Sequence, residues 1–250
     1  MNYYNEIEPF VAKWLTKLIK AGLISRGKVD GRSIRDVRPA DIKANRTHFF
    51  AGIGGWDYAL GLAGWPEDRE VWTGSCPCQP FSLAGNRKGQ ADERHLWPEW
   101  FRLIRECRPS TIFGEQVGSA IGHGWLDLVF DDLEAEGYAC GAVVLPACGV
   151  GAPHIRQRVW FVANSDSSRF DGPKISVLAG GSVKEVSDTP RAGGSVWSNA
   201  EWIGCDGKQR PTKPGLFPLA NGIPSRVGRL RAYGNAIVPQ LAAEFIRCAM

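Results

Sequence analysis

The chain has 250 residues, 44% of them hydrophobic and 22% charged, so it can hold one large domain or a core domain with a small appended one. It has no run of 18 apolar residues and no apolar signal segment near its N-terminus, which argues against a membrane span and against secretion. Its seven cysteines are an odd number, and Cys76 and Cys78 lie too close together for a disulfide framework, which favours a reducing cytoplasm.

Up to about residue 163, short apolar runs alternate with amphipathic stretches, and this alternation predicts an α/β fold with a mostly parallel sheet. Strands are expected at Tyr3–Asn5, His48–Ala51, Val71–Gly74, Thr111–Gly114, Gly141–Leu145 and Val159–Ala163. Helices are expected at Pro9–Ala21, Gly55–Ala63, Arg94–Cys107, Gly124–Glu136 and Val238–Ala249.

Residues 164–233 break this pattern and read as a small, loop-rich insert before the C-terminal helix. They contain ten Lys/Arg against six Asp/Glu, which accounts for the whole net charge of +4. A basic segment of this kind is a candidate for contact with a polyanion such as nucleic acid.

Two motifs carry most of the chemical information in the first half of the chain. The sequence FAGIGG (50–55) follows a predicted strand and opens a helix, so its backbone can approach a ligand closely, although it is not the dinucleotide-binding pattern. The sequence GSCPCQPFS (74–82) places Cys78 just past a strand end, between two prolines that fix its direction, as a nucleophilic thiolate requires. A buried structural cysteine and a Cys76/Cys78 metal pair are alternatives, but Cys140, Cys148 and His154 lack metal-ligand spacing.

Two further segments place charged groups near the same edge of the sheet. The segment TIFGEQVGS (111–119) reads as a strand that ends in Glu115, where a carboxyl group can donate a proton or can simply be a surface residue. Arg156 and Arg158 lie two residues apart as the chain enters the last strand. Strand alternation would put both side chains on one face, in a binding site or on a solvated edge.

Taken in order, FAGIGG (50–55), PCQPFS (77–82), EQV (115–117), RQR (156–158) and GNAIVP (234–239) resemble the motifs of DNA cytosine-5 methyltransferases. The likeness is greatest to the short kind carried by phages and prophages, and it covers residues 1–163 and 234–250. It implies a Rossmann-like domain that uses S-adenosylmethionine, with residues 164–233 as a target-recognition region. It also implies a bacterial or phage-infected cytoplasm, double-stranded DNA as partner, no metal and a monomer.

The resemblance implies a role for each matched residue. Cys78 would attack C6 of a flipped-out cytosine, Glu115 would bind or protonate N3, and Arg158, assisted by Arg156, would hold O2 and a phosphate. Residues implied to line the cofactor site are Phe50, Gly52, Ile53, Gly54, Gly55, Pro77, Leu96, Asn235 and Ala236. Residues implied to contact DNA are Gln79, Ser82, Arg87 and Lys88, together with Lys208 and Arg210 in the recognition region. The segment 82–97 resembles the family's mobile loop over the flipped base.

The chain departs from the family in several places. Gln116 stands where an Asn is usual, His154 replaces a Gln before the arginine pair, and His48 replaces an Asp ahead of the glycine motif. None of these changes touches the expected nucleophile.

The segments YYNEIEPF (3–10) and RGKVDGRSIRDV (26–37) resemble family segments that normally follow the glycine motif, here moved in front of it. Glu6 would then bind the cofactor ribose, Ile7 would pack on adenine, and Asp30 rather than Asp36 would accept the adenine amine. The alternative is a plain N-terminal amphipathic helix. If the strands keep their places, the order becomes 2-1-3-4-5, as in flavodoxin.

A right-handed crossover after the glycine motif would put helix 55–63 on the face opposite helix 9–21, and we predict that arrangement. Two other functions share many of the motifs. One is cytosine-5 methylation of transfer RNA, and the other is DNA binding by a catalytically idle relative, against which Pro77-Cys78-Gln79 and Glu115 argue.

Overall fold

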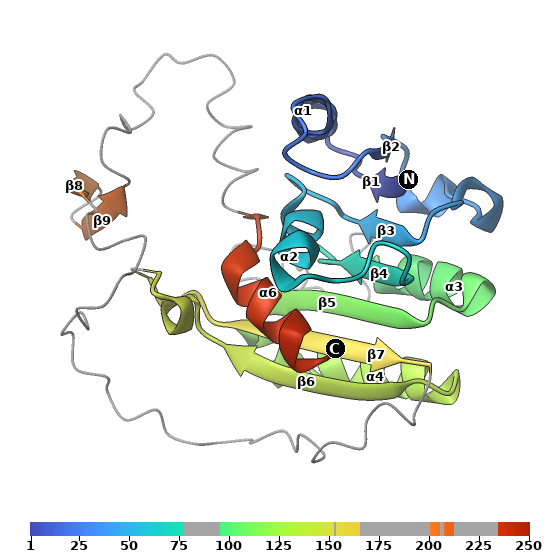
Figure 1. Cartoon of the computed structure of the whole chain (residues 1–250). Coiled ribbons are helices and arrows are strands. Elements are labelled where there is room, and N and C mark those ends of the chain that lie inside the picture. Colours follow the sequence, from blue (N-terminus) through green and yellow to red (C-terminus); the bar gives the residue numbers. More distant parts are fainter. Residues whose placement is uncertain (78–95, 153, 166–200, 206–207, 213–234) are drawn as a thin grey trace.

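The computed structural model describes residues 1–77, 96–152, 154–165, 201–205, 208–212 and 235–250 (Figure 1). For Ser119 and His123, and for the two stretches between 201 and 212, it describes the backbone only. Among the described residues, no helix is long and apolar enough to cross a membrane.

Seven of the described strands form one sheet in the order β2-β1-β3-β4-β5-β7-β6 (Figure 1). Strand β7 is antiparallel to both of its neighbours, and every other pairing is parallel. The predicted α/β class and the predicted order 2-1-3-4-5 are therefore confirmed. The strands are β1 (Asn2–Asn5), β2 (Gly27–Asp30), β3 (Arg46–Phe49), β4 (Val71–Gly74), β5 (Thr111–Val117), β6 (Ala139–Leu145) and β7 (Arg158–Asn164).

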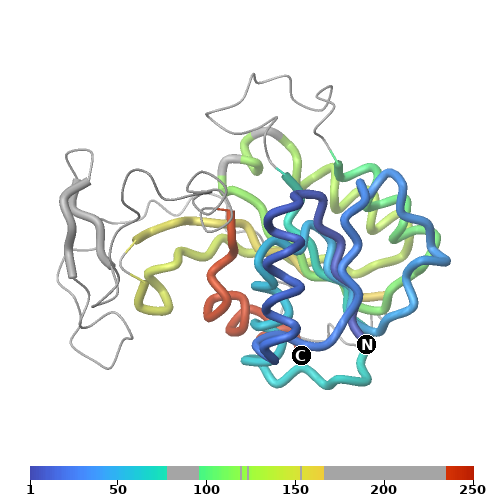
Figure 2. Tube along the Cα trace, turned by 90° about the horizontal axis from the view of Figure 1, so that it is seen from above, coloured from blue at the N-terminus to red at the C-terminus, as the bar shows by residue number. Residues whose placement is uncertain are grey.

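Helices cover both faces of this sheet. On one face lie α1, α2 and α6, and on the other lie α3 and α4 with two short turns of 3-10 helix (Figures 1 and 2). The helices are α1 (Pro9–Lys20), α2 (Gly55–Ala63), α3 (Trp97–Cys107), α4 (Trp125–Ala135) and α6 (Pro239–Cys248), and the turns are η1 (Ile34–Asp36) and η2 (Pro39–Asp41).

Large side chains fill the core on both faces because alternate strand residues point to opposite sides. Phe49 and Trp72 belong to the cluster under α3 and α4, where Trp100 is completely buried. Phe113 and Trp160 belong to the cluster under α2 and α6. Most of the chain's tryptophans are thus used in packing the two layers of helices onto the sheet.

The predicted face of α2 is wrong. Leu15 of α1 packs with Tyr4, Tyr4 stacks on His48 at 4.9 Å between ring centroids, and His48 Nε2 lies 3.5 Å from Asp57 Oδ1 of α2. Helices α1 and α2 therefore share one face of the sheet (Figures 1 and 2).

This placement makes the β3–α2–β4 connection left-handed. From β1 to β2 the chain moves one strand toward one edge of the sheet, and from β3 to β4 it moves one strand toward the other edge. The connecting helices α1 and α2 lie on the same face, so the two connections have opposite hands. The connection through α3 steps in the same direction as that through α2 but has its helix on the other face. Because parallel crossovers are right-handed in almost all proteins, the α2 connection is the exception. The opposite face is already filled by α3, α4 and the turns η1 and η2.

Within the region predicted as loop-rich, two short strands form an antiparallel hairpin, β8 (Glu201–Cys205) and β9 (Lys208–Thr212). This hairpin was not predicted from the sequence. Asn164 ends β7 and Ser165 follows it, and the other residues of the predicted recognition region lie outside the described residues.

Candidate active site

The predicted site residues gather where the parallel strands end. In parallel sheets, ligands bind at the carboxyl ends of the strands. Glu6 follows β1, the glycine turn follows β3, Ser75 and Pro77 follow β4, and Glu115 lies near the end of β5. Strand β7 runs in the opposite direction, so its first residue, Arg158, pairs with Val117 at this same edge.

The glycine turn holds a conformation that most residues avoid. Phe50, Gly52 and Gly54 all have positive φ angles, of 51°, 54° and 82°. A side chain at Gly54 would come within 3.0–3.3 Å of Ile24 and Leu15, so only glycine fits there without a shift in its neighbours. The turn leads directly into α2, with its first backbone N–H groups near the strand tips.

Glu6 joins the N-terminal segment to this turn. Its Oε2 accepts a hydrogen bond from the Gly52 N–H at 2.8 Å, and its Oε1 accepts one from the Glu8 N–H at 2.9 Å. Burial raises the pKa of Glu6, against the lowering effect of these two hydrogen bonds. Ile7, beside it, is 61% exposed although it is apolar. The structure thus brings Glu6 and the glycine turn together, as the transposed order requires.

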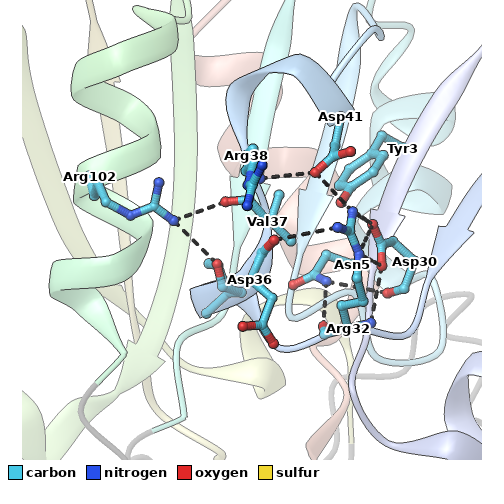
Figure 3. A network of polar contacts seen from close by, with 10 residues as sticks. Tyr3, Asn5, Asp30, Arg32, Asp36, Val37, Arg38, Asp41 and Arg102 are labelled. Atoms are coloured by element: carbon cyan, nitrogen blue, oxygen red, sulfur yellow. Dashed lines mark hydrogen bonds and ion pairs between the residues drawn. The ribbon is translucent and has the colours of Figure 1, made fainter.

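Asp30, at the end of β2, is 5% exposed and is held by its neighbours (Figure 3). Its oxygens accept hydrogen bonds from the Tyr3 hydroxyl at 2.8 Å and from the Arg32 backbone N–H and guanidinium at 2.6–3.2 Å. The hydrogen bond from Arg32 is the main reason why the pKa of Asp30 lies well below its usual range. A carboxylate has about four acceptor positions, so an adenine amine would compete with Arg32 for them. The assignment of Asp30 to that amine stays a prediction.

The same network ties down the segment that connects β2 to β3. Arg32 also pairs with Asp41 at 2.9 Å, and Arg102 of α3 donates to the carbonyls of Val37 at 3.0 Å and Ile34 at 3.4 Å (Figure 3). These contacts hold the turns η1 and η2 in a connection that has no α-helix of its own.

Cys78, the expected nucleophile, lies just outside the described residues, but the turn that leads to it is described as far as Pro77. Cys76 is 6% exposed, and its carbonyl accepts a hydrogen bond from Gln116 Nε2 at 3.4 Å. Gln116 Oε1 in turn accepts the Val117 N–H at 3.0 Å. Gln116, which stands where the family has Asn, therefore still links β5 to the cysteine turn.

Glu115 is buried beside this turn, with 7% of its surface exposed. Arg158 Nε lies 2.9 Å from Glu115 Oε1. Burial raises the pKa of Glu115, while Arg158, Arg156 and a hydrogen bond from Ser75 lower it, and burial prevails. The carboxyl group therefore retains a proton at a higher pH than an exposed glutamate, which suits a hydrogen-bond donor or general acid.

Arg156 reaches the site in a different way from that predicted. It precedes β7, which begins at Arg158, and its φ of 37° is not that of a strand. The prediction that strand alternation places both arginines on one face is therefore wrong, although both charges act on Glu115. The Arg156 Nη2 donates to the Ala236 carbonyl at 2.8 Å, which joins this site to the GNAIVP motif.

The remaining predicted residues divide into two groups. Pro77, Leu96 and Ala236 are half-buried and Asn235 is exposed, and Ile53 and Gly55 belong to the glycine turn and the start of α2. Gln79, Ser82, Arg87 and Lys88 lie outside the described residues with Cys78, and Lys208 and Arg210 are described only as backbone of β9. Among the described residues, no cluster of His, Cys, Asp and Glu could hold a metal ion.

Two polar residues of this site were not predicted from the sequence. Ser75 accepts a hydrogen bond from Trp56 Nε1 at 3.1 Å and bonds to Glu115. Helical spacing does not reveal that the indole N–H of Trp56 reaches the end of a strand. The role of Ser75 could have been suspected from the sequence, because Ser75 lies in the same segment GSCPCQPFS (74–82) as Cys78.

Comparison with known proteins agrees with this geometry. The family model described as C-5 cytosine-specific DNA methylase matches residues 64–189, half of the chain. The glycine turn and the N-terminal segment lie outside this match.

Curated relatives of the same kind match parts of the chain. The type II methyltransferase M.AgeI of Thalassovita gelatinovora is 33% identical over 48% of this chain and 28% of its own length. M.AluI of Cellulosimicrobium cellulans is 29% identical over 54% of this chain and 28% of its own length. M.NgoMIV of Neisseria gonorrhoeae is 36% identical over 42% of this chain and 35% of its own length. The matched part thus spans about a third or less of each of these relatives.

Among solved structures, a variant of Spodoptera frugiperda DNMT2 is similar with a TM-score of 0.48 and 17% identity, over 70% of this chain and 46% of that one. The family match over half of the chain, together with the motifs placed at one sheet edge, is decisive. The chain belongs to the C-5 cytosine-specific DNA methylase family.

Proposed function

We propose that this protein transfers a methyl group from S-adenosylmethionine to C5 of a cytosine turned out of double-stranded DNA, through a bond between the Cys78 sulfur and C6. One observation carries the proposal. The adjacent strands β3, β4 and β5 end in the glycine turn, the cysteine turn and the buried Glu115, all at one edge of the sheet. These are the parts that must meet around one base and one methyl donor.

Glu115 and the arginines would stabilise the charge that develops on the cytosine during the reaction. Addition of the Cys78 thiolate to C6 pushes electrons toward N3 of the ring, and C5 becomes nucleophilic. Glu115, whose pKa is raised by burial, would donate a proton to N3 and so stabilise that charge. Arg158, held 2.9 Å from Glu115, would orient the carboxyl group and bind O2 of the base.

The covalent bond formed at C6 is broken again at the end of the reaction. After C5 has received the methyl group, a base removes the C5 proton. The electron pair of that C–H bond then re-forms the C5–C6 double bond and expels the Cys78 thiolate. The cysteine is thus regenerated for the next cycle.

The residues at the ends of β1 and β3 fit S-adenosylmethionine. Glu6 places carboxylate oxygens beside the glycine turn, where they can accept hydrogen bonds from ribose hydroxyls, and Ile7 offers an exposed apolar side chain for an adenine ring. The Gly52 and Gly54 backbone gives close approach to the rest of the molecule. S-adenosylmethionine would supply an electrophilic methyl group on a sulfonium. Glu6 and Ile7 would orient it, and Pro77 would hold the cysteine turn against it.

Residues 164–233 are proposed as the target-recognition region, and residues 1–163 and 234–250 as the catalytic domain. The excess of Lys and Arg in the region suits contact with DNA phosphates, and Lys208 and Arg210 lie on the β9 strand of its hairpin. We propose that the protein acts as a monomer in a bacterial or phage-infected cytoplasm, either beside a restriction enzyme or in protection of phage DNA.

Transfer of labelled methyl groups tests the proposal. Purified protein is incubated with labelled S-adenosylmethionine and either duplex DNA or transfer RNA, with Cys78→Ala as the control. Methylation of DNA by the wild type alone is expected, and bisulfite sequencing of DNA from expressing cells would give the target sequence. Label in transfer RNA but not in DNA would replace the proposed substrate, and label transferred equally by Cys78→Ala would contradict the mechanism.

A further inference from the structure

Ser75 stands between the glycine-turn helix and Glu115. It is the first residue after β4 and lies three residues before Cys78. Its Oγ accepts a hydrogen bond from Trp56 Nε1 at 3.1 Å. Gly74 pairs with Gly114 between the parallel strands β4 and β5, so Ser75 stands beside Glu115, and a hydrogen bond from its hydroxyl lowers the pKa of that carboxyl group. An indole N–H can only donate, so the single hydroxyl hydrogen of Ser75 is left for Glu115. The direction of the second hydrogen bond is thus set by the first.

Trp56 is itself held firmly. It is 3% exposed, and its ring packs against Trp160 at 5.6 Å and Phe113 at 6.4 Å between centroids. As the second residue of α2 it directly follows the glycine turn. A fixed indole therefore connects the helix at the cofactor side of the site to the carboxyl group at the base side.

The charged groups that act on Glu115 come from one side only. Arg158 lies at 2.9 Å in β7, and Arg156 precedes the same strand. On the helical side, α2 presents the uncharged Trp56, and in α6 Glu244 and Arg247 pair with each other at the surface. Among the described residues, Ser75 is thus an uncharged hydrogen-bond donor to Glu115 beside the two arginines.

We propose that Ser75 is a positioning residue for Glu115 and that Trp56 fixes the direction of its hydrogen bond. Ser75 acts through Glu115 and not on the cytosine itself. This inference rests on the proposed function, because it describes how the proposed acid is held beside the base.

Two measurements test it, and one of them needs no catalysis. Glu115 is titrated by ¹³C NMR of labelled glutamate carboxyl groups, assigned with Glu115→Gln, in wild type, Ser75→Ala and Ser75→Thr. The rate constant kcat/KM on duplex DNA is measured against pH for the same proteins. Thr16→Ala is the control, since Thr16 lies on α1, is exposed, and its hydroxyl donates to the Ala12 carbonyl of the same helix at 3.0 Å.

Loss of the Ser75 hydrogen bond should raise the pH at which Glu115 titrates, because that bond favours the ionised form. The descending limb of kcat/KM should then move to higher pH, and its plateau should fall about tenfold as the carboxyl group loses its orientation. Affinity for S-adenosylmethionine should not change. Ser75→Thr should restore both properties, and Thr16→Ala should resemble the wild type.

An unchanged titration of Glu115 in Ser75→Ala would overturn the inference, whether or not the enzyme methylates DNA. A shifted titration in a protein that methylates nothing would support the positioning role and defeat only the proposed function. If Ser75→Ala did not fold, the titration of Glu115 would be measured in Trp56→Phe. This variant lacks the indole donor, so the Ser75 hydroxyl can rotate away from Glu115, and the same shift is expected. An unshifted titration in that variant would also overturn the inference.

Discussion

Glu6 is the residue on which the transposed arrangement of segments depends most. Its carboxylate receives the N–H groups of Gly52 and Glu8, so it orders the glycine turn even before a ligand binds. The sequence predicted its position at the tip of a strand, from a segment that resembles the family's ribose-binding motif. What the sequence did not show is the direct bond to Gly52, because that contact joins residues 46 positions apart.

The substitution Glu6→Ala should weaken S-adenosylmethionine binding about tenfold to a hundredfold and leave DNA affinity nearly unchanged, because hydrogen bonds to a charged group are each worth about 1.5–3 kcal/mol. Calorimetric titration with the cofactor checks this, with Glu8→Ala as the neighbouring control. Cofactor affinity that survives Glu6→Ala would rule out the ribose-binding role.

His48, a departure from the family, pairs with Asp57 inside the protein. Asp57 also accepts hydrogen bonds from the Ser25 N–H at 2.7 Å and from Asn2 Nδ2 at 2.8 Å. Burial alone would raise the pKa of Asp57, but His48 and the Ser25 amide outweigh it and lower the pKa to about 2. Three segments that are distant in sequence are thus joined at one buried carboxylate.

This pairing predicts an acid-dependent loss of stability. The folded-state pKa of Asp57 lies below its unfolded value, so the contribution is complete above about pH 4 and is lost as pH falls toward about 2. From that difference, Asp57→Asn should lower the free energy of unfolding by about 2 kcal/mol near neutral pH and by much less at pH 2. Urea denaturation against pH measures both, with the exposed Asp131→Asn as control. An equal loss at every pH would show that the charge of Asp57 is not responsible.

At the scale of elements, the sequence predicted most of the sheet but not the hand of one crossover. Apolar runs such as Val71–Gly74 and Thr111–Gly114 are strong strand signals, and the helices that cover them show helical spacing. The short strand Gly27–Asp30 has one buried residue and no clear alternation, so only its resemblance to a family segment indicated a strand there.

The left-handed β3–α2–β4 connection is an exception to the right-handedness of parallel crossovers, and side-chain packing explains it. Helix α2 covers Phe113 and Trp160 together with α6, and a right-handed path would have moved its apolar side away from them. The handedness rule follows from strand twist and acts locally, whereas the burial of these large side chains involves the whole face of the sheet. Sequence order alone does not reveal which of the two is stronger.

The connection from β2 to β3 depends on polar contacts because it lacks a helix. Arg102→Ala removes two hydrogen bonds to backbone carbonyls of 34–37, and we expect it to destabilise the fold by about 1–2 kcal/mol. Backbone amides of the segment 31–45 should exchange with solvent faster in that variant, as measured by hydrogen–deuterium exchange. Arg105→Ala, an exposed neighbour on α3, is the control. Unchanged exchange in 31–45 would mean that Arg102 does not hold these turns.

At the scale of the whole molecule, the proposed catalytic domain and the proposed recognition region differ in net charge. The region 164–233 carries the entire net positive charge. Its hairpin could not be predicted, since β8 and β9 are five residues each and are surrounded by glycine and proline. The strands β3, β4 and β5, in contrast, end at the glycine turn, at the turn before Cys78 and near Glu115, because apolar strand runs in the sequence mark these ends.

If this region contacts DNA, replacing Lys208 and Arg210 with alanine should reduce affinity for duplex DNA and lower the slope of log K against log salt by about one to two. Fluorescence anisotropy at several salt concentrations measures this, and Lys13→Ala and Lys17→Ala on α1 serve as a charge-matched control. A salt slope that is unaffected by the double substitution would place the phosphate contacts elsewhere.

Trapping of the covalent adduct tests the central claim most directly, because it detects the sulfur–carbon bond on which the proposed reaction depends. A duplex that contains 5-fluorocytosine at the target cannot lose a proton from C5, so a cysteine bound at C6 stays attached once the methyl group has been transferred. The account predicts a denaturation-resistant protein–DNA band that requires S-adenosylmethionine, maps to Cys78 by mass spectrometry and is absent from Cys78→Ala. A methylating enzyme that forms no such band, or forms it equally well without Cys78, would contradict the account.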